Sequence, residues 1–247
     1  MFFFKQKQIV LDEFPSVAPI HDNYGFAKAT EHLPDWWKQL PSSYDVVDEN
    51  NITYKNSTMK KCAGFIDYYR NSIILPMWAD LILKTHNDNW AARYSAKDLP
   101  AITSHDRRQH NSHFEDMIHI KLETMWTMRE KTGVNFAVSA PFFSDNMFVD
   151  KINIIPGILN FKYQSSININ LLMRPNTEVM IPNGMPLIHL IPLTESNVIV
   201  KNHLVSYEEW NRMQSNNYSS SFTSKYKRNV ELMKKKENKC PFGFGRK

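Results

Sequence analysis

The sequence predicts a mainly β protein, an antiparallel β-sandwich or jelly-roll-like barrel with a short helical C-terminal extension. Three observations support this fold class. Apolar and polar residues alternate in several short runs, turn-forming residues separate those runs at close spacing, and helical periodicity is sparse before residue 206. The chain has 247 residues, 42% of them hydrophobic, which is enough for one large core. We assign residues 1–205 to a β-sandwich domain and residues 206–247 to a helical, basic extension that docks on it.

The N-terminal region is rich in proline, which favours extended structure. Residues 1–7 are predicted to form an edge strand and residues 8–45 a loop-rich segment, with one helical turn that ends before Pro41. Trp36 and Trp37 are adjacent, so they cannot both face the core in any regular element. We interpret both rings as partly buried packing residues with polar indole tips, and Trp36 and Trp37 are the candidate interaction residues if one of them covers a seam or a partner.

Residues 45–84 are predicted to contain one surface strand followed by two core strands. Residues 45–61 are polar, which is typical of a strand bounded by surface turns. The next residues are rich in aromatic and β-branched side chains, which favours core strands over residues 62–70 and 72–84. Residues 85–112 lack a clear pattern and are interpreted as a long loop, a type of segment that often carries function.

A histidine and an aspartate in this predicted loop suggest one enzymatic hypothesis. His86 and Asp88 have the spacing with which iron- and 2-oxoglutarate-dependent oxygenases begin their triad of two histidines and one carboxylate. His189 or His203 could complete the triad, and Arg174 is available for the carboxylate of the co-substrate. The candidate metal ligands are thus His86, Asp88 and His189, and Arg174 joins them as a candidate catalytic residue. Because this spacing arises often by chance, a surface loop without chemistry is the alternative.

Four further histidines fall within fifteen residues, at His105, His110, His113 and His119. A cupin-like site would require His-x-His, then a glutamate and a later histidine on neighbouring strands, and this pattern differs. His119 alternates with Ile118 and Ile120, which predicts that it lies on the solvent side of a strand. Arg107 and Arg108 lie beside the other three histidines, and their charge disfavours a cation. We therefore favour surface histidines over a zinc site.

The second half of the chain predicts a series of half-buried strands, over residues 133–143, 159–164, 167–171 and 198–200. Residues 179–193 are predicted to form a β-hairpin with Asn183 and Gly184 in its tight turn, which closes one end of the sandwich. His189 shares a face with the apolar residues two positions away on either side. A buried histidine that is hydrogen-bonded to the backbone is therefore preferred over a ligand.

The C-terminal extension is predicted to be helical. Ser206 and Glu209 have the spacing of a capping box, which predicts a helix to about residue 214. Residues 215–224 are polar and are interpreted as a linker, and a second helix is expected over residues 225–236.

The positive charge of the protein is confined to this extension. Residues 225–247 contain nine lysines and arginines against two glutamates, a surplus of seven, whereas the whole chain carries +5. The first 224 residues therefore carry −2. Lys234, Lys235 and Lys236 are the predicted interaction residues for an acidic partner, and nucleic acid would bind only through this tail. A solvated helix is the alternative.

The cellular compartment is predicted from what the sequence lacks. Cys62 and Cys240 are too few for a disulfide framework, so we expect both to be reduced. The N-terminus has no pattern of a cleaved leader, and no run approaches the roughly 18 apolar residues of a membrane span. These observations predict a soluble protein of the cytoplasm with no membrane partner.

Five segments carry a resemblance to a known family. They are residues 33–38 (LPDWWK), 62–69 (CAGFIDYY), 74–81 (ILPMWADL), 181–187 (IPNGMPL) and 240–242 (CPF). Together they resemble an uncharacterised family of tailed-phage proteins, notably from T4-like marine phages, and the similarity spans most of the chain. The resemblance implies a viral gene product, located in the host cytoplasm or incorporated in the virion. It implies no catalytic residue, because members of the family are hypothetical proteins.

These observations lead to two functional hypotheses. The first is a phage-encoded structural or interaction protein without a cofactor, a candidate virion component, whose partners are other phage proteins, a host protein or further copies of itself. The alternative is an enzyme, either like the iron- and 2-oxoglutarate-dependent oxygenases or like the cupins, on a jelly-roll fold. No phosphate loop, dinucleotide fingerprint or nucleophile elbow is present in the sequence, which favours the first.

Overall fold

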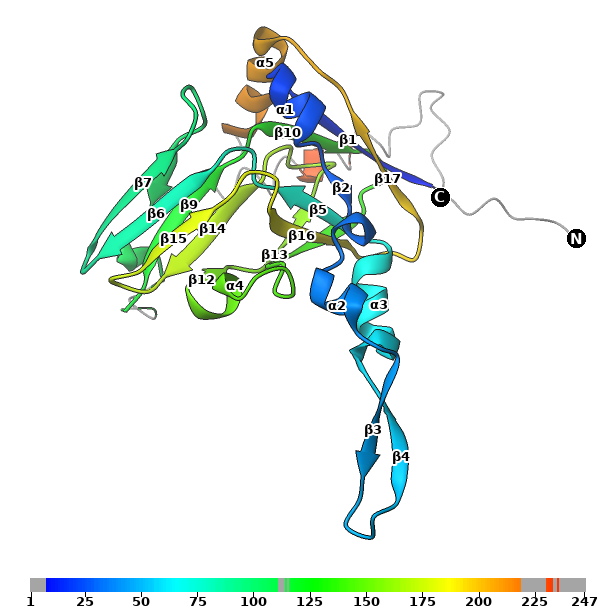
Figure 1. Ribbon diagram of the computed structural model, residues 1–247. Coiled ribbons are helices and arrows are strands. Elements are labelled where there is room, and N and C mark those ends of the chain that lie inside the picture. Colours follow the sequence, from blue (N-terminus) through cyan, green and yellow to red (C-terminus); the bar gives the residue numbers. More distant parts are fainter. Residues whose placement is uncertain (1–7, 111–113, 115, 219–229, 233–234, 236–247) are drawn as a thin grey trace, which may run out of the picture.

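The computed structural model describes residues 8–110, 114, 116–218, 230–232 and 235 (Figure 1). The described chain is mainly β, as the sequence predicts, and its strands form separate sheets and not one closed barrel. Among the described strands, all pairs are antiparallel except one parallel pair between the first and last strands, β1 and β17. No described helix is both long and apolar enough to cross a membrane.

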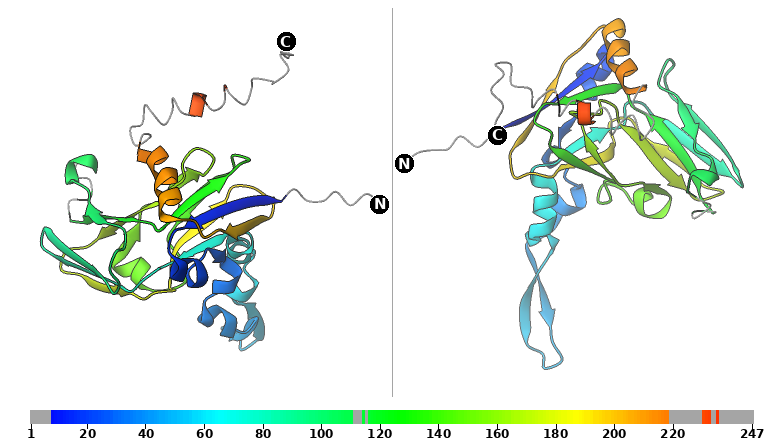
Figure 2. Two further views of the ribbon diagram at one scale, coloured as in Figure 1. Left: turned by 90° about the horizontal axis from the view of Figure 1, so that it is seen from above. Right: turned by 180° about the vertical axis from the view of Figure 1, so that it is seen from behind.

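Four of the five sheets build the body of the molecule. The largest has the order β13 (Gly157–Asn160), β11 (Asn135–Ser139), β16 (Pro186–Pro192), β5 (Ile73–Pro76) and β2 (Ala27–Lys28). The four-stranded sheet has the order β12 (Ile152–Ile154), β14 (Asn168–Met173), β9 (Ile118–Glu123) and β8 (Ile102–Ser104). The three-stranded sheets are β10 (Trp126–Glu130), β1 (Ile9–Pro15) and β17 (Val198–Asn202), and β15 (Glu178–Ile181), β6 (Leu81–His86) and β7 (Asn89–Tyr94). The fifth sheet is the hairpin of β3 (Ser43–Val47) and β4 (Thr53–Ser57), which projects from the body (Figures 1 and 2).

The helices are short and lie between or after the strands. The α-helices are α1 (Ala18–Asn23), α2 (Asp35–Gln39), α3 (Ala63–Arg70), α4 (Met147–Asp150) and α5 (Tyr207–Tyr218). The 3-10 helices are η1 (Ala29–His32), η2 (Met59–Lys61) and η3 (Arg107–His110). Figure 1 shows α2 and α3 at the base of the projecting hairpin and α5 at the opposite end of the molecule. The helical turn expected before Pro41 is present as α2.

One large core is shared by the four sheets of the body. The predicted alternation is confirmed in β9 and in β14 up to Leu171, and β6, which was predicted only as part of a core strand over residues 72–84, alternates as well. Leu11, Leu83, Ile120 and Leu190 each come from a different sheet and are fully buried in this core. The alternation thus assigns the correct face of these strands to the interior.

The predicted hairpin at residues 179–193 is wrong in its pairing. Strands and a turn are present where they were predicted, and Gly184 has the expected positive φ of 73°. However, β15 pairs with β6, and β16 pairs with β5 and β11, so the two strands belong to different sheets. The turn between them is fixed to the β5–β6 connection, because the Asp80 carboxylate accepts a hydrogen bond from the Asn183 N–H at 2.9 Å.

Three further segments differ from their predicted structure. Residues 63–70 form α3 and not a core strand, because Phe65 and Tyr69, four residues apart, pack on the same side of a helix. Residues 85–112 are not a long loop, since they contain the end of β6, all of β7 and β8, and η3. The predicted loop-rich N-terminal segment also contains β1, a strand flanked by β10 and β17.

The C-terminal extension begins as predicted. The Ser206 hydroxyl accepts a hydrogen bond from the Glu209 N–H at 3.2 Å, which caps α5. The helix continues to Tyr218, beyond the predicted end at residue 214. It contacts the body where Gln214 donates a hydrogen bond to the Thr127 hydroxyl at 3.0 Å. The predicted edge strand at residues 1–7 and most of the basic tail lie outside the described residues.

β1 carries a buried carboxylate that the sequence analysis did not identify. Glu13 is 1% exposed and accepts hydrogen bonds from the Phe26 N–H at 3.0 and 3.1 Å. A Cβ atom at Gly25 would lie 2.9 Å from a Glu13 carboxylate oxygen, so only glycine allows this close approach. Burial raises the pKa of Glu13 from 4.5 to about 8, and the hydrogen bond from Phe26 opposes this shift.

This raised pKa predicts a pH-dependent stability. The folded-state pKa lies above the unfolded value, so the stability that the protonated carboxyl contributes is complete below about pH 4.5 and is lost as the pH rises through about 8. We expect Glu13→Gln, which cannot ionise and retains an acceptor for Phe26, to remove a fall of up to about 3 kcal/mol in the free energy of unfolding between about pH 5.5 and 8.5. Urea unfolding at both pH values measures this. The exposed Glu208→Gln is the control, and an unchanged pH dependence in Glu13→Gln would contradict the assignment.

Candidate interaction surface

The projecting hairpin, residues 43–57, is the most distinctive surface of the molecule, and we call it the arm. Its turn is closed by the Asp48 carboxylate, which accepts hydrogen bonds from the Asn50 and Ile52 N–H groups at 2.9 and 2.8 Å. Asn51 adopts a positive φ of 59°, which asparagine tolerates better than most residues. The residues after Val47 therefore form a tight turn that is capped by its own Asp48 side chain. The two strands that lead to this turn, β3 and β4, extend by about 3.4 Å per residue.

The strand register separates the side chains of the arm into two faces. Tyr44 is opposite Asn56 and Val46 is opposite Tyr54, and residues directly opposite each other project to the same side. Following the alternation, one face carries Tyr44, Val46, Ile52 and Tyr54, together with Asn56, whose side-chain amide donates a hydrogen bond to the Tyr44 hydroxyl at 3.1 Å, and we call it the apolar face. The other face carries mainly small or charged side chains, at Ser43, Asp45, Val47, Thr53, Lys55 and Ser57.

The apolar face has no cover from the body. Tyr44 is 50% exposed, Ile52 60% and Tyr54 49%, and β3 and β4 make their main contacts with each other. An isolated two-stranded hairpin is at best marginally stable in water, and exposed apolar surface contributes nothing to its folding. A contiguous apolar patch of this kind is characteristic of a protein-binding site.

The base of the arm, in contrast, is firmly attached. The Trp37 indole N–H donates a hydrogen bond to the Met59 carbonyl at 3.1 Å, and the Trp37 ring stacks on Phe65 at 5.2 Å. The Lys60 ammonium lies 4.2 Å from the centre of the Trp37 ring and donates to the carbonyls of Trp37 and Lys38 at 3.1 and 2.9 Å. These contacts join the segments that enter and leave the arm.

The two predicted interaction residues therefore have distinct roles. Trp37 is half-buried beneath the arm, whereas Trp36 is 41% exposed and donates its indole N–H to the Phe143 carbonyl at 3.0 Å. Both rings contact Phe65 of α3. The adjacent tryptophans thus mark the base of the candidate surface, and the apolar face beyond them was missed. Its signal in the sequence is the alternation of aromatic and aliphatic residues on either side of the turn, which a half-buried strand would share.

His189 lies deep in the same region. It is fully buried, as predicted, and its ring packs edge-on against Tyr68 at 4.1 Å. Its partner is a side chain and not the backbone: the Ser72 hydroxyl contacts Nε2 and donates to the Tyr68 carbonyl. Because a hydroxyl has one proton, this arrangement requires Nε2–H to donate to Ser72. Burial lowers the pKa of His189 to about 4, so the ring is neutral at pH 7.

The structure separates the candidate metal ligands. His86 and Asp88 are exposed at the tip of the β6–β7 hairpin, and His189 is enclosed in β16 of another sheet. Arg174 does lie near this tip, since its carbonyl accepts a hydrogen bond from the Thr85 hydroxyl at 2.6 Å. The alternative distal histidine, His203, instead pairs with Asp12 at 2.9 Å. Within the described residues, no three histidine, cysteine or acidic side chains form a group that could hold a metal ion.

A shallow pocket of about 380 Å³ brings together residues that the sequence analysis treated separately. Asp88 lines it with His105 and His119, whose ring centres are 4.4 Å apart. His119 lies on the outer side of β9, as predicted, and its Nε2 is 3.1 Å from the Asn170 side-chain oxygen. The Asp106 carboxylate, also in the lining, accepts hydrogen bonds from the Arg108 guanidinium at 2.7 and 2.9 Å. The pocket is thus lined by polar groups that already have protein partners.

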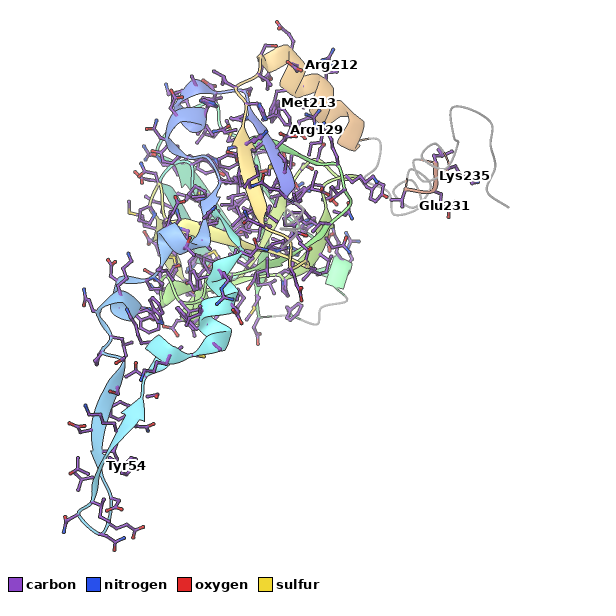
Figure 3. The ribbon with its side chains drawn as sticks, turned by 90° about the vertical axis from the view of Figure 1, so that its right-hand side faces the viewer. Tyr54, Arg129, Arg212, Met213, Glu231 and Lys235 are labelled. Atoms are coloured by element: carbon purple, nitrogen blue, oxygen red, sulfur yellow. The ribbon has the colours of Figure 1, made fainter. Side chains whose placement is uncertain are left out.

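The predicted basic site can be followed only in part. Lys235 is within the described residues, whereas Lys234, Lys236, His113 and Cys240 lie outside them. Figure 3 shows Lys235 beyond α5 and Tyr54 at the arm, at separate ends of the molecule. Comparison with known proteins adds no assignment, since no protein-family model and no curated protein matches this chain.

The contacts of Trp37 predict a local and a global effect of its removal. We expect Trp37→Ala to lower the free energy of unfolding by about 2 kcal/mol, because a half-buried ring and its hydrogen bond are lost. Amide exchange at Thr58 should also accelerate, since this amide bonds to Ser42 across the base. Urea unfolding and hydrogen exchange measure the two effects. Tyr54→Ala, in the exposed part of the arm, should change stability by less than about 0.5 kcal/mol. Equal effects of the two substitutions would contradict an anchoring role for Trp37.

The positions of the candidate ligands also predict the outcome of metal analysis. We expect His86→Ala to leave the iron content of the purified protein unchanged, because His86 lies apart from His189. Elemental analysis after incubation with ferrous iron and 2-oxoglutarate tests this. Stoichiometric iron in the wild type that is lost in His86→Ala would restore the oxygenase hypothesis.

Proposed function

We propose that this protein is a structural or interaction protein of a tailed phage and that the arm is its binding element. The single observation that carries the proposal is the uncovered apolar face on a firmly anchored, projecting hairpin. The phage origin rests on the resemblance of five segments to tailed-phage proteins. Other phage proteins or a host protein are the proposed partners, in the host cytoplasm or in the virion.

The geometry of the arm supports binding over a purely architectural role. An element that only filled the fold would bury its apolar side chains against the body, and here Tyr44, Ile52 and Tyr54 are about half exposed or more. Tyrosine supplies a large contact area at low cost in side-chain entropy, which is why it is frequent in protein interfaces. With Tyr44 and Tyr54 beside Val46 and Ile52, the apolar face has the composition expected of an interface core.

The alternative hypothesis, an enzyme, has less support than an interaction role. An oxygenase-like or cupin-like site with iron and 2-oxoglutarate would need His86, Asp88 and His189 around one ion, and His189 is enclosed by Tyr68, Tyr69 and Ser72 instead. No observation on the described residues favours this second function over the first.

The proposed function predicts that incorporation into particles depends on the apolar face. In the phage that encodes this protein, mass spectrometry of purified virions should detect the wild-type chain. We expect Ile52→Ser combined with Tyr54→Ser to reduce its abundance in virions by about tenfold or more, because hot-spot residues of this type dominate binding energy. Val47→Ser is the matched control, since Val47 is also 60% exposed but lies on the opposite face of the arm.

Two results would overturn the proposal. If the wild-type chain were absent from purified virions, the virion role would be wrong. If the Ile52→Ser and Tyr54→Ser chain were incorporated as well as wild type, the arm would not be the binding element. Equal expression in infected cells and an unchanged urea midpoint establish that neither variant acts through misfolding.

A further inference from the structure

We propose that the apolar face of the arm binds the basic C-terminal segment, residues 225–247, of a second copy of this chain. The proposal rests on the proposed function, because it names the partner of the same arm. It is carried by three observations: the charges of the arm and the segment, the apolar side chains of both, and the positions of the arm and of α5, the helix that precedes the segment, at opposite ends of the molecule.

The charges of the two segments are complementary. The arm contains Asp45, Asp48 and Glu49 against Lys55, a net charge of −2. The C-terminal segment carries +7, and the first 224 residues together carry −2. The part of the chain outside the arm and the C-terminal segment is therefore neutral overall, which makes this segment the strongest positive partner that the chain itself offers.

The segment also offers apolar side chains in a suitable pattern. Tyr226, Val230 and Met233 occur at intervals of four and three residues among the lysines and arginines, the spacing of one face of a helix. A basic sequence with one apolar face suits a surface that presents apolar side chains beside acidic ones. The arm has this combination, with Ile52 and Tyr54 next to the acidic turn.

The positions of the two segments favour a second copy over the same chain. Figure 3 shows Arg212 and Met213 of α5 at one end of the molecule and Tyr54 of the arm at the other. Only six residues separate Tyr218, the end of α5, from residue 225. Six residues span at most about 20 Å, so this linker alone cannot carry the start of the basic segment far from the end of α5.

An arm-to-tail contact has a definite consequence for assembly. The two surfaces that meet are different, so the interface is heterologous and each bound copy still presents one free arm and one free tail. Association of this kind continues beyond the dimer unless the copies close into a ring. Because opposite charges contribute to the contact, it should weaken as ionic strength rises.

The test uses full-length variants in which one of the two surfaces is impaired. The arm variant carries Ile52→Ser and Tyr54→Ser, and the tail variant carries Lys234→Glu, Lys235→Glu and Lys236→Glu. Sedimentation velocity of the wild type should show a mass that grows with concentration past that of a dimer. Each variant alone should associate about tenfold or more weakly than the wild type. An equimolar mixture should form dimers and stop there, because it contains one intact arm and one intact tail. Val47→Ser should behave like wild type.

The outcomes separate this inference from the proposed function. A wild-type chain that stays monomeric at all concentrations would overturn the inference, and loss of the arm variant from virions would still support the proposed function. A tail variant that associates like wild type would show that the arm binds a surface other than the basic segment, and the inference would be wrong. If the tail variant lost binding to duplex DNA while its self-association was unchanged, the tail would be a nucleic-acid segment and the inference would be wrong.

Discussion

The contact of Trp37 with Phe65 and Lys60 holds together the part of this molecule to which we assign a function. It joins α2, α3 and η2, the three short helices that surround the base of the arm. A two-stranded sheet cannot supply its own stable foundation, so its direction has to be set by the body. Because the base is bonded on both legs, the body sets the direction of the apolar face although Tyr44, Ile52 and Tyr54 remain about half exposed or more.

Groups capable of chemistry are distributed over the fold and not gathered at one place. His189 is neutral and enclosed by aromatic rings, Glu13 is enclosed under β1, and His105 faces His119 in a shallow pocket on another sheet. Each of these groups contacts neighbouring protein groups, and they do not converge on one site. The exposed apolar side chains of the arm, in contrast, are not buried by the body. The arm is therefore the best candidate for a functional surface.

Sequence reasoning recovered the features that depend on local pattern. The faces of β9 and β14, the positive φ of Gly184 and the cap at Ser206 all follow from residue type and spacing. It failed where a choice of partner decides the structure. The local sequence does not determine that β15 pairs with β6, or that β16 pairs with β5 and β11. In α3, the β propensity of aromatic residues masked the four-residue spacing of Phe65 and Tyr69. For the arm, alternation alone cannot distinguish a strand whose apolar face is buried in the fold from a strand whose apolar face is exposed.

The parallel pairing of β1 with β17 affects how this protein can be made. β1 leaves the ribosome before both of its neighbours, since Ile9 is paired with Val198 of β17 and Leu11 with Glu130 of β10. At a translation rate of about 5–20 residues per second, roughly ten seconds or more pass before β17 exists. Until then β1 and Glu13 lack part of their final surroundings, so the β10–β1–β17 sheet is completed only after β17 has been synthesised. Completion of this sheet is therefore a late, long-range event, whereas strand pairing within the arm is local, and the base of the arm is completed once Phe143 is available to Trp36.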